Sequence, residues 1–249
     1  MADVSCSGRH VPVVQPRFGW PTSTDQTFSS SHTLRLGHPQ GSPYWSPDGH
    51  QIVFDAFSPE DSHLHIWRID AEGGAPRRLA TQAGDESVPT WSHDGRWIYF
   101  TSMQGASARD VWRVSADGKI SERLIREGSG PFACEAMDGK TLLFQPRDAD
   151  SPLMAMPLKG GAARQFVPCV KNSAFGVGAL GVYYVPCEPS PDPSVHVLDP
   201  KSGRDRRLGT LDGITERALG LSVSPDGRTI VYLRELGVKA DLMLIENFR

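Results

Sequence analysis

A short motif, Trp-Ser-Pro-Asp-Gly, returns along this chain at a nearly constant interval and limits what the chain can fold into. It occurs in "YWSPDGHQIVF" from residue 44 and in "TWSHDGRWIYF" from residue 90, and more loosely in "CEAMDGKTLLF" from 134 and "SVSPDGRTIVY" from 222. The Asp-Gly pairs begin at Asp48, Asp94, Asp138 and Asp226. The first three lie about 45 residues apart and the last gap is about twice as long, which indicates a chain of similar structural units.

Each unit reads as four short strands. The first two flank the Asp-Gly pair, the third comes next as "HIWRID" or "DVWRVS", and the fourth as "PRRLA" or "SERLI". Short alternating segments rich in β-branched and aromatic residues are typical of β-strands. In the Asp-Gly turns, the Asp side chain caps the turn and Gly adopts the positive φ that tight hairpins require. Units of four strands at this period predict an all-β fold, a β-propeller of four-stranded blades.

The strand pair W-S-P-D-G-x-x-I-x-F followed by D-x-W-R-V resembles the TolB-type propeller repeat, from about residue 38 to the chain end. That family includes the propeller of the periplasmic protein TolB and propellers appended to bacterial regulators, kinases and peptidases. The resemblance implies that ligands bind at one face, where loops enter the first strands and join the second strands to the third. We call this the loop-bearing face.

The stretch "SAFGVGALGVYYV" (173–185) contains a G-x-G-x-x-G pattern. A dinucleotide site would need a helix after the glycines, because the helix N-terminus holds the pyrophosphate. Gly181 is instead succeeded by a β-type segment and then by the proline-rich "PCEPSPDPS", which a helix would not tolerate. Aligning residues 182–184 with 98–100 makes this stretch the first hairpin of the missing fourth repeat. We therefore expect no dinucleotide.

We favour five blades, closed by pairing of Thr33–Gly37 with the last blade, which lacks a fourth strand of its own. Residues 1–32 would then be an N-terminal extension and 33–249 a single propeller domain. The alternative is six blades, with residues 4–37 as a degenerate blade whose second strand Pro12 would interrupt. A closed ring predicts a monomer, and unpaired edge strands predict a dimer.

Charge and hydrophobicity narrow the classes of partner. The formal net charge of -3 makes nucleic acid a poor partner, and no apolar run is long enough for a membrane span. The first residues lack a basic segment followed by an apolar core, so the sequence predicts a cytoplasmic protein, or a periplasmic one if the chain is a processed fragment.

The loop-bearing face is expected to carry more carboxylates than bases, which would attract a cation or a basic partner. The loops that enter the first strands contribute His38, Asp85, Glu86, Glu127, Asn172, Asp212 and Glu216. The loops between second and third strands contribute Glu60, Asp61, Arg147, Asp148, Asp150, Glu188, Asp192 and Glu235. Of these we assign ligand binding to His38, Glu86, Arg147, Asp148 and Glu216. Ordinary solvation of loop carboxylates is the alternative.

Glu135 occupies a position that is apolar in the other repeats, where Trp45, Trp91, Phe175 and Val223 stand. A carboxylate there must be paired, protonated or bound to a cation, because burying it alone is unfavourable. Alternatively, this strand has slipped or become exposed. If Glu135 binds a divalent cation, its companions would be Glu86, Asn172 and Glu216, and Glu135 would be the candidate catalytic residue.

Cys169 and Cys187 flank the first two strands of the fourth repeat, and Cys134 lies on the neighbouring inner strand. A disulfide, a thiolate metal site and a reactive cysteine are open alternatives, but buried free thiols are the commoner arrangement. His63 and His65 lie on one face of a strand at a spacing that can chelate a metal. His65 also aligns with Asp110 and Asp241, which favours a polar strand start that recurs among the repeats.

No nucleophile elbow, metalloprotease helix motif or phosphate-binding loop is present. We therefore expect a non-catalytic propeller that binds a protein or peptide through the acidic loop-bearing face and needs no cofactor. The alternative is a cation-dependent hydrolase of esters, lactones or phosphoesters with its site at the central channel. Fold alone does not decide between them.

Overall fold

The structure is a computed structural model that describes residues 40–79, 84–103, 109–147, 149–188, 193–211, 221–224, 226–236 and 239–246. For Gln40, Glu127, Ser129 and residues 233–246, only the backbone is described. All regular elements in these ranges are β-strands, which confirms the all-β prediction. In the same ranges, no helix is long and apolar enough to cross a membrane. The expected extension 1–32 and closing strand Thr33–Gly37 lie outside the described residues.

The first two repeats each form one four-stranded antiparallel sheet whose strands pair in chain order. The first sheet consists of β1 (Gln40–Trp45), β2 (Gln51–Ser58), β3 (His63–Asp70) and β4 (Arg77–Arg78). The second consists of β5 (Asp85–Trp91), β6 (Trp97–Met103), β7 (Arg109–Ser115) and β8 (Ser121–Ser129). Each repeat is therefore a simple meander.

The third and fourth repeats are fused into one seven-stranded sheet, because one long strand belongs to both. Its strands are β9 (Ala133–Glu135), β10 (Thr141–Phe144), β11 (Ser151–Pro157), β12 (Arg164–Gly178), β13 (Gly181–Pro186), β14 (Ser194–Leu198) and β15 (Asp205–Thr210). The first half of β12 pairs with β11, from Arg164 to Val170. Its second half pairs with β13, from Val170 to Gly178. β12 is thus the last strand of the third repeat and the first strand of the fourth.

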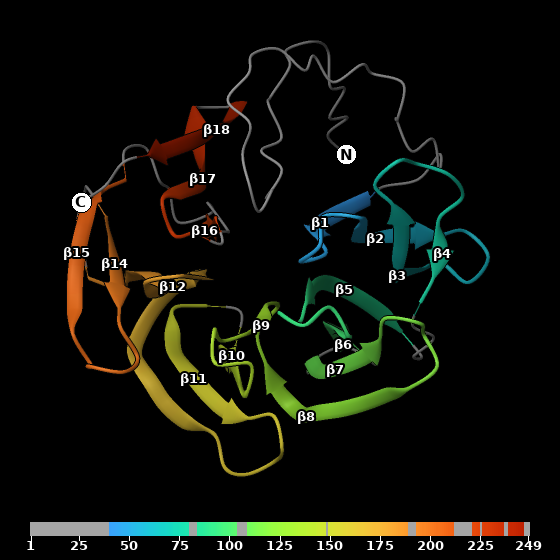
Figure 1. Cartoon of the computed structure of the whole chain (residues 1–249), viewed down its shortest axis with the longest axis horizontal. Helices are drawn as coiled ribbons and strands as arrows, with labels where there is room; N and C mark the ends of the chain where they lie inside the picture. The colour runs from blue at the N-terminus through green and yellow to red at the C-terminus, as the bar shows by residue number, and fades with distance from the viewer. Residues whose placement is uncertain are drawn as a thin grey trace.

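The last repeat contributes a three-stranded sheet of β16 (Leu221–Val223), β17 (Thr229–Leu236) and β18 (Lys239–Glu246). In the described part of the chain, β18 is the outer edge of this sheet. The sheets succeed one another around a common centre, toward which β1, β5, β9, β12 and β16 lie (Figure 1). The chain therefore has the radial arrangement of a β-propeller.

The stretch with the dinucleotide-like glycines is a β-hairpin, as predicted. β12 ends at Gly178 and β13 begins at Gly181, and these two residues pair across the turn. A side chain at Gly181, whose φ is 134°, would collide with the backbone of Leu198 on the next strand. A side chain at Gly176 would press on Val223 of β16. The glycines therefore serve close packing of strands.

The Asp-Gly turns are built by a repeated set of local hydrogen bonds. In the first, the Ser46 hydroxyl donates to Asp48 Oδ1 at 2.6 Å, which also accepts the N–H of His50 at 3.0 Å, and Gly49 has a φ of 72°. The same set recurs at Ser92 and Asp94, at Ser115 and Asp117, and at Ser224 and Asp226. The predicted role of the aspartates as turn caps is confirmed.

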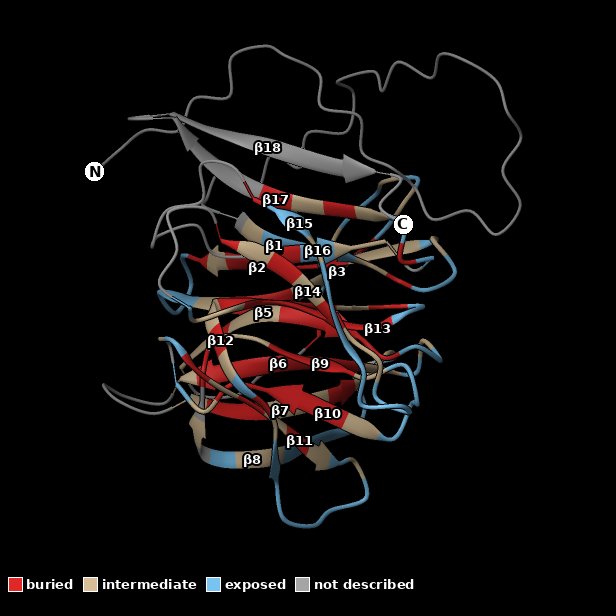
Figure 2. Ribbon diagram, turned by 90° about the vertical axis from the view of Figure 1, so that its left-hand side faces the viewer, coloured by how far each residue is buried: buried red, intermediate tan, exposed pale blue. Residues whose placement is uncertain are grey.

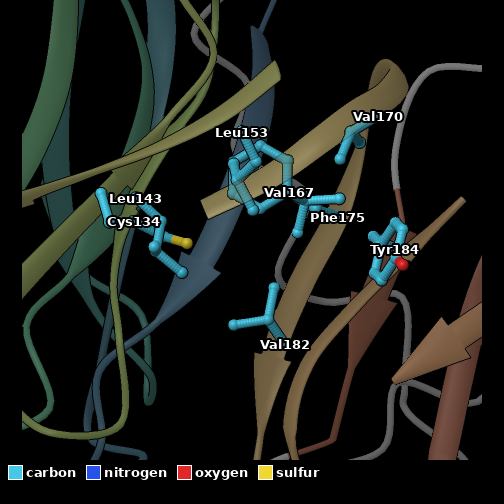
Figure 3. Close-up of a cluster of buried hydrophobic side chains, with 9 residues drawn as sticks. Cys134, Leu143, Leu153, Val167, Val170, Phe175, Val182 and Tyr184 are labelled. Carbon is cyan, nitrogen blue, oxygen red and sulfur yellow. The ribbon is translucent and has the colours of Figure 1, made fainter. Parts of the chain in front are cut away.

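Buried residues lie along the strands, while most of the turns are exposed (Figure 2). One cluster joins the third and fourth repeats: Cys134 and Leu143 contribute from one side, and Phe175, Val182 and Tyr184 from the other. Figure 3 shows these side chains converging between the strands. Adjacent repeats are therefore held together by apolar burial, the dominant favourable term in folding.

Candidate functional site

The loop-bearing face brings the first two repeats together where β3 and β5 begin. His63 Nδ1 lies 3.1 Å from Asp85 Oδ1, and the N–H of Leu64 donates to the same oxygen at 2.9 Å. Both side chains remain partly exposed, His63 at 46% and Asp85 at 38%. The loop before β3 and the loop before β5 therefore lie side by side here, on the same face, as expected.

Directly beneath this pair lies a buried polar network around His65. The His65 side chain is 1% exposed, and its Nε2 lies 2.8 Å from Asp61 Oδ2. A guanidinium nitrogen of Arg78 lies 2.9 Å from His65 Nδ1. The ring is thus surrounded by Asp61, Glu86 and Arg78.

Two carboxylates border this histidine, and they differ in exposure. Glu86 is fully buried; its Oε2 accepts the N–H of Ile66 at 3.3 Å and lies 3.4 Å from His65 Nδ1. Asp61 is exposed, and its hydrogen bond with His65 lowers the pKa of Asp61 to about 2. Asp61 therefore stays ionised over the physiological range, and Glu86 serves the internal network.

The second repeat builds the same corner with an ordinary ion pair. Asp110 stands where His65 stands, and Arg123 NH1 donates to Asp110 Oδ2 at 3.1 Å. The register agrees, because Arg78 pairs with Trp67 and Arg123 pairs with Trp112. This supports the interpretation of His65 as a polar strand start. Both of its ring nitrogens have protein partners.

The structure describes several other predicted residues of this face in the third and fourth repeats. The N–H of Asn172 donates to Asp150 Oδ1 at 3.1 Å, and Asn172 has a positive φ of 40°. Arg147 and Glu188 are exposed. His38, Asp148, Asp192, Asp212 and Glu216 lie outside the described residues, as do the side chains of Glu127 and Glu235.

Glu135 ends β9 inside the central channel, on the side of the Asp-Gly turns, and is 6% exposed. The Tyr99 hydroxyl donates to its Oε2 at 2.6 Å, and the backbone N–H of His93 donates to its Oε1 at 3.3 Å. Burial and the neighbouring carboxylate raise the pKa of Tyr99, so the hydroxyl keeps its proton. The strand has neither slipped nor become exposed, and the carboxylate is paired through hydrogen bonds.

An exchange of side-chain size between adjacent repeats explains why Glu135 replaces an aromatic residue. In the first four repeats, one residue of the second strand lies against the end of the first strand in the next repeat. The two residues share a hydrophobic cluster for Val53 with Trp91, Leu143 with Phe175 and Tyr183 with Val223. An aliphatic residue thus meets an aromatic one, and a tyrosine meets a smaller side chain. Tyr99 with Glu135 obeys this rule, with a hydrogen bond added.

A small cavity opens beside Glu135, with about 40 Å³ of space for water-sized molecules. It lies among the first strands, and its walls are Tyr44, Trp91, Phe132, Cys134, Gly176, Val177, Leu221, Ser222 and Val223, with His93 at the turn. Burial and the Glu135 charge raise the pKa of the Cys134 thiol to about 12, so it stays protonated.

The structure does not bring Glu135 and Glu86 together. Glu86 is near the start of β5, in the His65 network, whereas Glu135 lies near Trp91 at the other end of that strand. Among the described residues, no group of three or more His, Cys, Asp or Glu side chains is placed to hold a metal ion. A divalent-cation site formed by Glu135 with Glu86, Asn172 and Glu216 remains a prediction, and Glu216 lies outside the described residues.

Cys169 and Cys187 form a disulfide, with a Cα–Cα distance of 5.5 Å. The commoner state of buried free thiols, expected from the sequence, is wrong for this pair. The reason is register: Val170 pairs with Pro186, which places the adjacent cysteines opposite each other on β12 and just after β13. Cys134 is a buried free thiol.

Sequence reasoning missed Tyr99, Tyr44 and Phe132 as neighbours of Glu135. A signal for Tyr99 was present, because Tyr99 and Tyr183 stand where Val53 and Leu143 stand in their repeats. The position that each one meets in the next repeat, Glu135 or Val223, is not aromatic. Comparing successive repeats pairwise would have linked Tyr99 to Glu135.

Comparisons with known proteins agree with this architecture. The family model of the TolB beta propeller domain matches residues 26–175, more than half of the chain. An uncharacterized protein of Agrobacterium fabrum is 32% identical over 127 residues, covering 47% of this chain and 42% of that protein. The Tol-Pal system protein TolB 1 of Novosphingobium aromaticivorans is 34% identical over 61 residues, 24% of this chain and 14% of its own length.

Among solved structures, the crystal structure of TolB from Acinetobacter baumannii aligns with a TM-score of 0.68 at 21% identity. The alignment covers 84% of this chain and 52% of that one. This likeness shows the fold. The chain spans about half or less of the length of each of these relatives.

Proposed function

Because the chain belongs to the TolB β-propeller domain family, we propose that it is a non-catalytic propeller that binds a protein or peptide partner through its loop-bearing face. The observation that carries the proposal is the set of exposed carboxylates on that face. A partner with lysine or arginine side chains would complement them, and complementary charge increases association rate and specificity.

The carboxylates that support this proposal come from several repeats, and all of them are exposed except Asp85, which is partly exposed. Glu60 and Asp61 lie between β2 and β3, Asp85 begins β5, Asp150 precedes β11 and Glu188 comes after β13. The hydrogen bonds of Asp61 and Asp85 to histidines fix their positions before a partner arrives. Preorganised groups of this kind lose less conformational entropy on binding.

We also propose that the chain works in an oxidising compartment such as the periplasm. The Cys169–Cys187 disulfide is the support, since disulfides persist outside the reducing cytoplasm. The family resemblance to periplasmic TolB agrees with this location. The proposal replaces the cytoplasmic prediction made from the N-terminal sequence.

For the ring itself, we propose five blades closed by Thr33–Gly37 on the free edge of β18. The sheet that ends in β18 has three strands in the described residues, where the first two repeats have four. A strand from the other end of the chain would complete it, which predicts a monomer. Sedimentation of a variant with Leu34→Pro and Leu36→Pro tests this, because an exposed edge strand promotes association.

Selection from a displayed library of short random peptides tests the binding proposal. We expect enriched peptides to carry lysine or arginine and to bind more weakly as salt rises. The double variant Glu60→Gln and Glu188→Gln should weaken binding roughly tenfold. Its matched control is Glu72→Gln, an exposed carboxylate between β3 and β4 on the opposite face, which should bind like the native chain. Equal affinity in all variants would reject the loop-bearing face as the binding surface.

A further inference from the structure

Among the described residues, the carboxyl group of Glu135 beside the cavity is buried without a basic side chain close to it. Within the described residues, no side-chain nitrogen of Lys, Arg or His comes within 4.0 Å of this carboxylate, whose partners are the Tyr99 hydroxyl and the backbone N–H of His93. Each carboxylate oxygen can accept more than one hydrogen bond. Glu135 can therefore accept a donor from a ligand without giving up either contact.

The walls of the cavity suit a small organic cation. Trp91 and Phe132 contribute aromatic rings, as does Tyr44, which is 42% exposed, and Val177 and Leu221 add apolar surface. Aromatic faces attract ammonium groups through their quadrupole, most strongly where water is excluded. A hydrated divalent ion would find one carboxylate here among mainly apolar groups, whereas such ions prefer several oxygen ligands.

Trp91 lines the same cavity and is 5% exposed. Its Nε1 atom is buried and has no hydrogen-bond partner. The Nε1 atoms of Trp67 and Trp112 are unpaired in the same way, so Trp91 contributes its indole ring to the cavity wall and no accessible donor.

We propose that this cavity, on the Asp-Gly-turn side of the central channel, binds a primary ammonium group, with Glu135 as its counter-charge. The group could belong to a lysine side chain or to the free N-terminus of a peptide. The proposal goes beyond the proposed function, since the cavity lies away from the loop-bearing face.

Titration of the full chain with small amines, monitored through the indole N–H resonance of Trp91 in NMR spectra, tests the proposal. Trp91→Phe assigns the resonance. Glycinamide represents an N-terminus, n-butylamine represents a lysine side chain, and acetamide is the uncharged control. We expect saturable shifts with both amines, a smaller or no shift with acetamide, and tighter binding of whichever source the site selects.

Two variants test separately the charge of Glu135 and the space in the cavity. Glu135→Gln removes the charge and should weaken amine binding at least tenfold. Ser222→Leu, at an exposed residue on the cavity wall, should block the cavity and leave Glu135 unchanged. Glu60→Gln, on the loop-bearing face, should bind amines like the native chain, so failure here is distinguishable from failure of the proposed function.

Three results would overturn the proposal: no saturable shift with either amine, equal binding by the native chain and both cavity variants, or displacement of the amines by low calcium concentrations. The last result would identify a divalent-metal site instead. Circular dichroism confirms that each variant is folded before its binding is compared.

Discussion

The hydroxyl of Tyr99 on β6 donates a 2.6 Å hydrogen bond to Glu135 on β9, and so joins the second strand of one repeat to the first strand of the next. Both residues are buried, and 36 positions of sequence separate them. Removing the hydroxyl in Tyr99→Phe takes away one of the two donors to a buried carboxylate. We expect a loss of about 1–3 kcal/mol in the free energy of unfolding, measured by urea denaturation. Tyr184→Phe, whose hydroxyl partner Asp205 is exposed, is the matched control and should lose less.

Exchange of side-chain size across the repeat boundary predicts a compensating pair. Tyr99→Val alone leaves a cavity and an under-hydrogen-bonded Glu135, and Glu135→Trp alone overfills the site. The double variant recreates the Val53 and Trp91 pair of the preceding boundary. In a double-mutant cycle, we expect the double variant to be more stable than the sum of the two single effects. Additive effects would contradict the exchange rule.

The hydrogen bond from the backbone N–H of His93 to Glu135 should contribute to the stability of the fold. Pro47 occupies the same place in the first Asp-Gly turn, so proline fits this turn, but it cannot donate to Glu135. We expect His93→Pro to destabilise the fold by about 1–3 kcal/mol, whereas His93→Ala, which keeps the N–H, should be close to native. Thermal unfolding of both variants checks this, and equal melting temperatures would rule out a role for the donor.

The disulfide predicts sensitivity to reductant. Closing a loop between residues 18 positions apart stabilises a fold by roughly 3 kcal/mol through the unfolded chain. Cys169→Ser with Cys187→Ser should lower the melting temperature to that of the reduced native protein. Cys134→Ala should still respond to reductant, because Cys134 is a free thiol. A melting temperature unaffected by reductant would argue against the bond.

The turn aspartates predict acid sensitivity. The hydrogen bonds from Ser115 and from the N–H of Lys119 lower the pKa of Asp117 to about 2, and the pKa values of Asp48, Asp94 and Asp226 are lowered by similar turns. Since these pKa values lie below those of the unfolded chain, near 4, the stabilisation is present above pH 4. It is lost as the pH falls toward 2.

Urea midpoints measured between pH 5 and pH 2 check this expectation. Asp117→Asn should be less stable than the native chain at pH 5 and should lose less stability on acidification. Parallel curves for the two proteins would show that Asp117 does not contribute.

The sequence predicts well the features that depend on residues close together along the chain. The S-x-D-G turns use contacts among residues at most five positions apart, so the motif alone specifies them. The hairpin of "GVGALG" is predicted by the same repeat alignment. β12 is less predictable: Pro168 suggests a break, yet the strand continues, with irregular register between Val170 and Phe175.

The candidate sites depend on contacts between repeats, which the sequence predicts poorly. Glu135 is recognisable as an exception within its repeat, but its partner Tyr99 belongs to the neighbouring one. The disulfide depends on the register of β12 against β13, and the spacing of two cysteines leaves that register open. Likewise, Glu86 and Glu135 are both acidic and both near β5, but they lie toward opposite ends of it.

β12 has a consequence for how the molecule loses its structure. Its 15 residues hydrogen-bond to β11 along one half and to β13 along the other, and Cys169 fastens its middle to Cys187. The third and fourth repeats therefore cannot open one at a time, as independent hinged segments would. Their backbone amides should exchange with solvent deuterium as one group, and mechanical extension of the chain should release both repeats in a single step.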